Sequence, residues 1–93
     1  MSIETHTREF TITNKKGLHA RASVKFVQTV GRFKSNVTVS RCGETVGGLS
    51  IMGLLTLGAA IGTTIQVTAS GVDAEECLSA LDTLLADKFG EEE

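Results

Sequence analysis

The amino-acid sequence predicts an α+β fold, an open-faced β-sandwich in which three helices cover one face of a four-stranded, mainly antiparallel sheet. Segments with alternating apolar residues, typical of half-buried strands, and segments with helical periodicity follow each other as strand, helix, strand, strand, helix, strand, helix. A short turn joins the two central strand segments, which favours an antiparallel hairpin. Because 93 residues is the size of one compact domain, we expect a single domain over residues 1–93.

A first strand and a first helix are expected on either side of a glycine-containing loop. Residues 10–13 alternate between apolar and polar side chains, and residues 14–17 break this pattern. From His19, apolar residues recur at helical spacing until Gly31, where we expect the helix to stop. The apolar residues of this helix are Ala20, Val24, Phe26, Val27 and Val30. We expect His6 to be exposed to solvent in a polar segment before the strand.

The predicted hairpin spans residues 33–47. Within its first strand, Phe33, Ser35, Val37 and Val39 alternate with polar residues and are expected to point inward. Residues 40–43 form the expected turn, and residues 44–47 form a short second strand.

Ser50 precedes an unusually apolar segment that ends at Gly58, which predicts a short helix capped by the serine hydroxyl. For Leu54 and Leu57 we expect burial in the core. A helix that is apolar nearly all round, on a domain with one covered sheet face, must leave some side chains exposed.

The remaining elements are a strand over residues 63–70 and a last helix. Asp73 and Glu76 have the spacing of a capping box at the start of this helix. Its apolar face consists of Leu78, Leu81, Leu84 and Leu85. We expect residues 90–93 to form a frayed acidic tail.

Composition excludes several classes of protein. A net charge of -2, with four Phe as the only aromatic residues, argues against a nucleic-acid binder. Apolar runs stay well below the roughly 20 residues of a membrane span, so we expect no membrane insertion and a cytoplasmic protein. Cys42 and Cys77 lie far apart in sequence, which gives no support to a metal or dithiol site.

His19 is the residue best placed for chemistry, because it stands where loop turns into helix. The backbone N–H groups of a helix start attract anions and disfavour a positive imidazole, which leaves a ring nitrogen free to attack phosphorus. Arg21 could stabilise the attached phosphate. The sequence contains no nucleotide-binding Gly-x-x-x-x-Gly-Lys-Ser/Thr loop, so phosphate would come from a partner protein. From the residues alone, a histidine making a local hydrogen bond beside a solvated arginine is the alternative.

Two motifs resemble one known family. Residues 17–22, Gly-Leu-His-Ala-Arg-Ala, are similar to the active-site segment of the HPr phosphocarriers of the bacterial phosphoenolpyruvate-dependent phosphotransferase system. Residues 50–54, Ser-Ile-Met-Gly-Leu, resemble the second signature of that family, and the similarity runs from about residue 10 to residue 89. The resemblance implies that His19 accepts the phosphoryl group and that Arg21 steadies it. It also implies that Ser50 is a regulatory phosphorylation site and that partners contact Ala20, Ile51, Met52 and Leu55.

The resemblance further implies a relay component, not a self-sufficient enzyme, with no cofactor or metal. Its expected partners are an enzyme I-type phosphotransferase, a downstream acceptor domain of the EIIA type and an HPr serine kinase, with the chain itself monomeric. Both a sugar-uptake branch and a nitrogen-regulatory branch fit the sequence. A non-relay regulatory module that binds proteins through the Ser50 helix is the alternative function.

Two positions depart from the family pattern. Ala22 stands where many members have proline, in the first turn of the helix, so we expect some loss of rigidity there. Leu49 stands where members phosphorylated on the serine often carry a basic residue, which weakens the expectation for Ser50. The pair Lys15 and Lys16 could steer an acidic partner toward the active loop.

Overall fold

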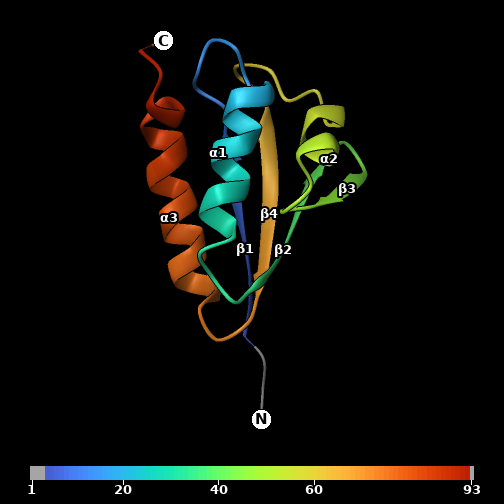
Figure 1. The fold of residues 1–93 in the computed structure, drawn as a ribbon. Coiled ribbons are helices and arrows are strands. Elements are labelled where there is room, and N and C mark those ends of the chain that lie inside the picture. Colours follow the sequence, from blue (N-terminus) through green and yellow to red (C-terminus); the bar gives the residue numbers. More distant parts are fainter. Residues whose placement is uncertain (1–3, 93) are drawn as a thin grey trace.

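The computed structural model describes residues 4–92. Its strands form one sheet in the order β1-β4-β2-β3, and every neighbouring pair is antiparallel. All helices lie on one face of this sheet (Figure 1), which confirms the predicted open-faced α+β fold. In chain order the elements are β1 (Thr5–Thr11), α1 (Ala20–Val30), β2 (Asn36–Arg41), β3 (Glu44–Gly47), α2 (Ile51–Thr56), β4 (Thr64–Ser70), α3 (Ala74–Ala86) and the short 3-10 helix η1 (Lys88–Gly90).

Strand β1 begins earlier than the sequence pattern predicts, at Thr5. On its open face, the Thr5 hydroxyl bonds that of Ser70 and the Thr7 hydroxyl bonds that of Thr68, each at 2.9 Å. Such cross-strand polar pairs stabilise the first half of β1, which contains no apolar residue. The expected position of His6 in a lead before the strand is therefore wrong, because His6 lies within β1 and is only partly exposed.

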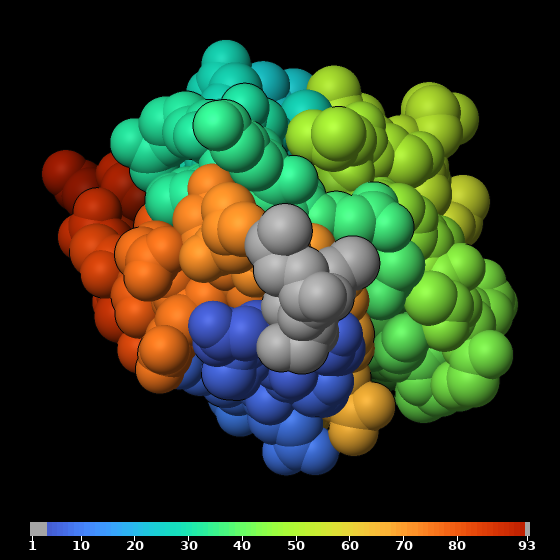
Figure 2. Space-filling view, turned by 90° about the horizontal axis from the view of Figure 1, so that it is seen from below, coloured from blue at the N-terminus to red at the C-terminus, as the bar shows by residue number. Residues whose placement is uncertain are grey.

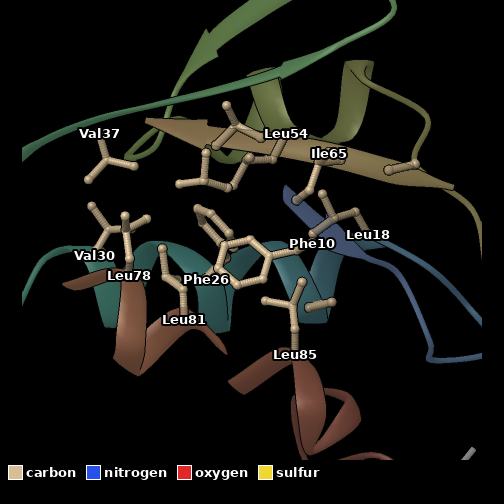
Figure 3. Close-up of a cluster of buried hydrophobic side chains, with 14 of the residues drawn as sticks. Phe10, Leu18, Phe26, Val30, Val37, Leu54, Ile65, Leu78, Leu81 and Leu85 are labelled. Atoms are coloured by element: carbon tan, nitrogen blue, oxygen red, sulfur yellow. The ribbon is translucent and has the colours of Figure 1, made fainter. Parts of the chain in front are cut away.

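The hydrophobic core fills the space between the sheet and the helices. Figure 3 shows Phe26 of α1 among side chains from the sheet, such as Ile65, and from α3, such as Leu81. All three side chains are 0% exposed, and burial of each stabilises the fold by about 1.5–3 kcal/mol. The expected inward orientation of Val37 and Val39 is confirmed.

Helix α1 turns Phe26 and Val30 into the core, as its apolar periodicity predicts, but not every apolar residue of the helix faces inward. Ala20 and Val24 are exposed, which corrects the prediction. Two polar residues take buried positions because their hydroxyls bond carbonyls of the same region: Ser23 donates to Leu18 at 3.3 Å and Thr29 donates to Lys25 at 3.0 Å. The buried set is Ala22, Ser23, Phe26, Thr29 and Val30.

Helix α2 starts as predicted. The Ser50 Oγ accepts a hydrogen bond from the Gly53 N–H at 2.9 Å, which confirms the serine cap. Leu54 and Leu57 are buried, as expected. Neither α2 nor any other helix within residues 4–92 has the length and apolar character needed to cross a membrane.

Asp73 joins α3 to the start of β2 and does not form the predicted capping box. Its carboxylate accepts hydrogen bonds from the Lys34 N–H at 2.8 Å, the Ser35 N–H at 2.9 Å and the Ser35 hydroxyl at 2.5 Å. These contacts use up the oxygens that a capping box would offer to helix amides. Figure 2 views the molecule from below, at the end where α1 stops. In this view the segment before β2 packs against the segment that leads into α3. As a result β2 begins at Asn36, later than predicted.

Replacing Asp73 with asparagine is expected to lower the melting temperature at neutral pH. The Lys34 N–H and the Ser35 hydroxyl lower the pKa of Asp73 below its ordinary value of 3.8, so the carboxylate stabilises the fold above that value. This stabilisation disappears as pH falls through the lowered pKa of the folded state. Thermal unfolding followed by circular dichroism should show a clear difference between variant and wild type at about pH 7 and a smaller one at about pH 2.5. An equal difference at both pH values would contradict the assignment.

Candidate functional site

The loop between β1 and α1 is held by backbone contacts that require glycine at position 17. Gly17 has a φ of +65°, and a Cβ there would lie 2.4 Å from the carbonyl oxygen of Ala59. The Asn14 side-chain amide donates to the Gly17 carbonyl at 2.8 Å, and the Leu18 N–H donates to the Ala59 carbonyl at 2.9 Å. The loop therefore delivers the next residue, His19, to a fixed place.

His19 is the N-cap of α1, as the sequence indicates. The backbone N–H of Arg21 donates to its Nδ1 at 3.3 Å, so the ring caps the helix that it begins. The His19 carbonyl accepts from the Ser23 N–H at 2.9 Å. With 25% of its side chain exposed, the imidazole is accessible from one side.

Glu91 binds the opposite edge of this imidazole. Its Oε2 lies 2.5 Å from the His19 Nε2, and its Oε1 accepts from the Asn14 amide at 3.1 Å. The hydrogen bond from His19 lowers the pKa of Glu91, with a smaller contribution from Asn14. The ionised carboxylate can only accept, so Nε2 is the donor, and in the neutral ring Nδ1 carries the free electron pair. The prediction of a frayed tail is wrong for Glu91, which has 14% of its side chain exposed.

A hollow next to Glu91, the residue that contacts His19, gathers charged residues from three segments, which meet at one end of the molecule (Figure 1). Residues Lys15 and Lys16 come from the loop, Arg21 from α1, and Glu91 and Glu92 from the chain after η1. Glu91 contacts the His19 ring and lines this hollow together with three cations, which can attract a dianionic group to the site. The arrangement therefore suits a nucleophile that accepts phosphate.

The comparisons with known proteins agree with this geometry. A family model described as the PTS HPr component phosphorylation site matches residues 6–87. The chain belongs to the HPr family of phosphocarrier proteins. A phosphocarrier protein HPr from Cupriavidus necator is 49% identical over 86 residues, which cover 92% of this chain and 97% of the relative. The crystal structure of HPr-C-His from Thermoanaerobacter tengcongensis matches with a TM-score of 0.90 and 41% identity, over 95% of this chain and 99% of that chain.

HPr-like chains also occur inside longer proteins. A multiphosphoryl transfer protein of Escherichia coli O157:H7 is 37% identical over 86 residues, which make up 89% of this chain and 23% of that protein. Membership of the HPr family gives this chain the general role of a phosphocarrier in the phosphotransferase system, rather than that of a catalytic enzyme.

The residues expected to contact partners differ in exposure. Ala20 is exposed beside His19 in sequence. On α2, Met52 is 71% exposed and Ile51 is 36% exposed, whereas Leu55 is only partly exposed. Next to α2 in the chain, Leu49 is also exposed, at 63%, and was not among the predicted contacts.

Sequence reasoning missed two residues of the site, Asn14 and Glu91. Asparagine is common in exposed turns, yet Asn14 is 0% exposed and its side-chain amide donates to both Gly17 and Glu91. Glu91 reaches partners 72 and 77 positions away in sequence. No local sequence pattern predicts contacts between residues so far apart. A run of three acidic residues at a chain end is typical of a solvent-exposed segment.

Proposed function

We propose that His19 accepts a phosphoryl group from an enzyme I-type phosphotransferase and passes it to an acceptor domain of the EIIA type. Residues 1–93 act as one HPr-like unit in this relay, which we place in the cytoplasm. The proposal rests chiefly on one observation: the unprotonated Nδ1 of His19 lies at the N-terminus of α1, where it accepts from the N–H of Arg21, a residue that lines the charged hollow. Membership of the HPr family supports it.

The chemistry needs little from this chain beyond binding and charge. The electron pair on Nδ1 forms a bond to phosphorus while the bond from phosphorus to the donor breaks, and that electron pair stays on the donor. The Arg21 side chain, which lines the hollow, and the amides of the first turn of α1 would stabilise the added negative charge. A hydrogen bond to a charged group contributes about 1.5–3 kcal/mol. The partner supplies the positioning of the reacting groups.

We also propose that partners dock on the exposed apolar side chains of α2 together with Ala20. Met52 and Ile51 support this proposal, because large apolar groups exposed near an active residue are typical of interaction surfaces. Leu55 supports it less, since it is partly covered.

Incubation of the purified protein with phosphoenolpyruvate and an enzyme I-type protein tests the function. Intact mass spectrometry should detect addition of a single phosphoryl group, labile in acid and stable in base. Failure to take up phosphate from enzyme I proteins of several bacteria would contradict the proposal and favour the regulatory binding module.

Replacing Arg21 with alanine is expected to slow phosphoryl uptake by about tenfold or more, because one charge-assisted contact to the phosphoryl group is lost. Initial rates in the same assay measure this effect. Arg32 provides the control, since it is an exposed arginine just beyond the opposite end of α1, and Arg32→Ala should leave the rate unchanged. Equal rates of phosphoryl uptake for both variants would show that Arg21 does not contribute to the transfer.

For Ser50, the structure supports the capping role, and a regulatory role is a proposal from the family resemblance. A phosphoryl group on Ser50 would place negative charge at the start of α2, where it would repel acidic partner surfaces. Treatment with an HPr serine kinase and mass spectrometry, with Ser50→Ala as control, tests this role.

A further inference from the structure

The chain after α3 follows a path that carries Glu91 back to His19. Lys88, Phe89 and Gly90 all have positive φ values, of 54°, 57° and 76°. Two consecutive non-glycine residues in this region are costly, at about 1–3 kcal/mol each, and persist only where other contacts compensate. The reversal of the chain therefore depends on specific anchors.

Two anchors hold this reversal in place. The Phe89 side chain is 1% exposed and belongs to the hydrophobic core. Its carbonyl oxygen accepts a hydrogen bond from the Lys25 Nζ of α1 at 2.5 Å. Since both contacts lie within two residues of Glu91, they restrict where its carboxylate can reach.

At the site itself, both oxygens of the Glu91 carboxylate are engaged. One binds the buried Asn14 amide at 3.1 Å and the other binds the His19 Nε2 at 2.5 Å. The imidazole is thus held at both nitrogens, by the Arg21 N–H on Nδ1 and by Glu91 on Nε2. Two contacts of this kind fix both the orientation of a ring and the nitrogen that carries the proton.

We propose that Glu91 is a positioning residue for phosphoryl transfer, which keeps the proton of His19 on Nε2 so that Nδ1 is the acceptor. The inference deepens the proposed relay function and rests on it. Glu91 lies outside residues 6–87, which match the family model, so the match itself assigns this residue no role.

The same contact assists transfer in both directions. When Nδ1 bonds to phosphorus, no proton leaves His19, because the ring retains its Nε2 proton and gains a positive charge. The Glu91 carboxylate lies directly against that charge. When the acceptor takes the phosphoryl group, the N–P electron pair returns to Nδ1 and the ring is neutral again.

Other charges near the contact must be distinguished from Glu91. Lys15, Lys16 and Arg21 face the same hollow from the loop and α1, and Glu92 faces it from the next position in the chain. Glu92 is exposed and carries the same charge as Glu91. Glu92→Ala is thus the matched control, since it removes one negative charge from the hollow and leaves the imidazole contact in place.

Nitrogen-15 NMR of the imidazole tests the inference without any phosphoryl transfer. At about pH 8.5, where an imidazole is neutral, wild type and Glu92→Ala should show His19 in the Nε2–H form. Glu91→Ala should show part of His19 in the Nδ1–H form, because only the longer contact from the Arg21 N–H to Nδ1, at 3.3 Å, then favours the Nε2–H form. The spectra of backbone amides away from the site should be unchanged in both variants.

Rates of phosphoryl uptake from phosphoenolpyruvate and an enzyme I-type protein give the second readout. Glu91→Ala should be slower than wild type by about tenfold, the effect of one lost charge-assisted contact. Glu92→Ala should be as fast as wild type or faster, because it removes a negative charge from the hollow and leaves the imidazole contact in place. An unchanged tautomer in Glu91→Ala, an unchanged or faster rate, or equal slowing in both variants would each overturn the inference. Absence of phosphoryl uptake by wild type would refute the relay function instead, and the tautomer measurement would still judge Glu91.

Discussion

Replacing His19 with alanine is expected to abolish phosphoryl uptake completely, with no residual signal above background. The alanine has no nitrogen to form the bond to phosphorus, and neither Arg21 nor the loop lysines can replace it, because cationic side chains lack a free electron pair. Intact mass spectrometry after incubation with phosphoenolpyruvate and an enzyme I-type protein measures the result. The fold should persist, since His19 lies at the surface end of α1 and outside the hydrophobic core.

His6 supplies the matched control for this experiment. It is the only other histidine of the chain and lies in β1 beside Glu4. His6→Ala should accept phosphate like wild type. Phosphoryl uptake by His19→Ala, or its loss in His6→Ala, would show that the phosphate is carried elsewhere. If His19→Ala keeps partner affinity and cellular effect, the regulatory binding module is favoured over the relay.

Replacing Gly17 with alanine is expected to combine the largest loss of stability with slower phosphoryl uptake. An alanine at this φ costs about 1–2 kcal/mol. Its Cβ would also lie 2.4 Å from the Ala59 carbonyl oxygen and 2.9 Å from the Ala60 Cα, both of them backbone atoms. Relief of this overlap must shift the loop, at a further cost of about 1–3 kcal/mol, and it moves His19 with it.

Gly58 separates the two contributions to this effect. Its φ of +61° is close to that of Gly17, but a Cβ there meets nothing within 4 Å. Urea unfolding followed by circular dichroism should therefore show that Gly58→Ala lowers the free energy of unfolding less than Gly17→Ala does. The expected difference between the two variants is about 1–3 kcal/mol. Phosphoryl uptake should slow only in Gly17→Ala. Equal losses of stability would indicate that the contact with Ala59 relaxes without cost.

The elements that sequence alone predicts are those whose signal is local. The helix cap at Ser50 and the start of α1 at His19 depend on residues within three positions, and both are confirmed. The hairpin of β2 and β3 likewise follows from alternation and a turn.

Predictions failed where a distant partner decides the structure. Asp73 has the spacing of a local cap, but the amides of residues 34 and 35 bind its carboxylate across 38 or more positions. Thr5 and Thr7 are not apolar, so the alternation pattern does not predict a strand there. They belong to β1 because they pair with β4, where their hydroxyls bond those of Ser70 and Thr68.

The same distinction applies to the site. His19 and Arg21 are two positions apart, so the sequence predicts them together. Glu91 reaches His19 only because the chain reverses at Phe89. The same holds for the buried face of α1. Val24 is apolar but exposed, because the packing of α1 against the rest of the fold, and not the local sequence, decides which side chains of the helix are buried.

A transfer experiment with labelled phosphate tests the relay most directly. The protein is phosphorylated from radiolabelled phosphoenolpyruvate by an enzyme I-type protein, purified, and then mixed with an EIIA-type acceptor domain. We expect the label on His19 before mixing and on the acceptor domain afterwards. Label on another residue, or label on His19 that does not move to any acceptor domain tested, would contradict it.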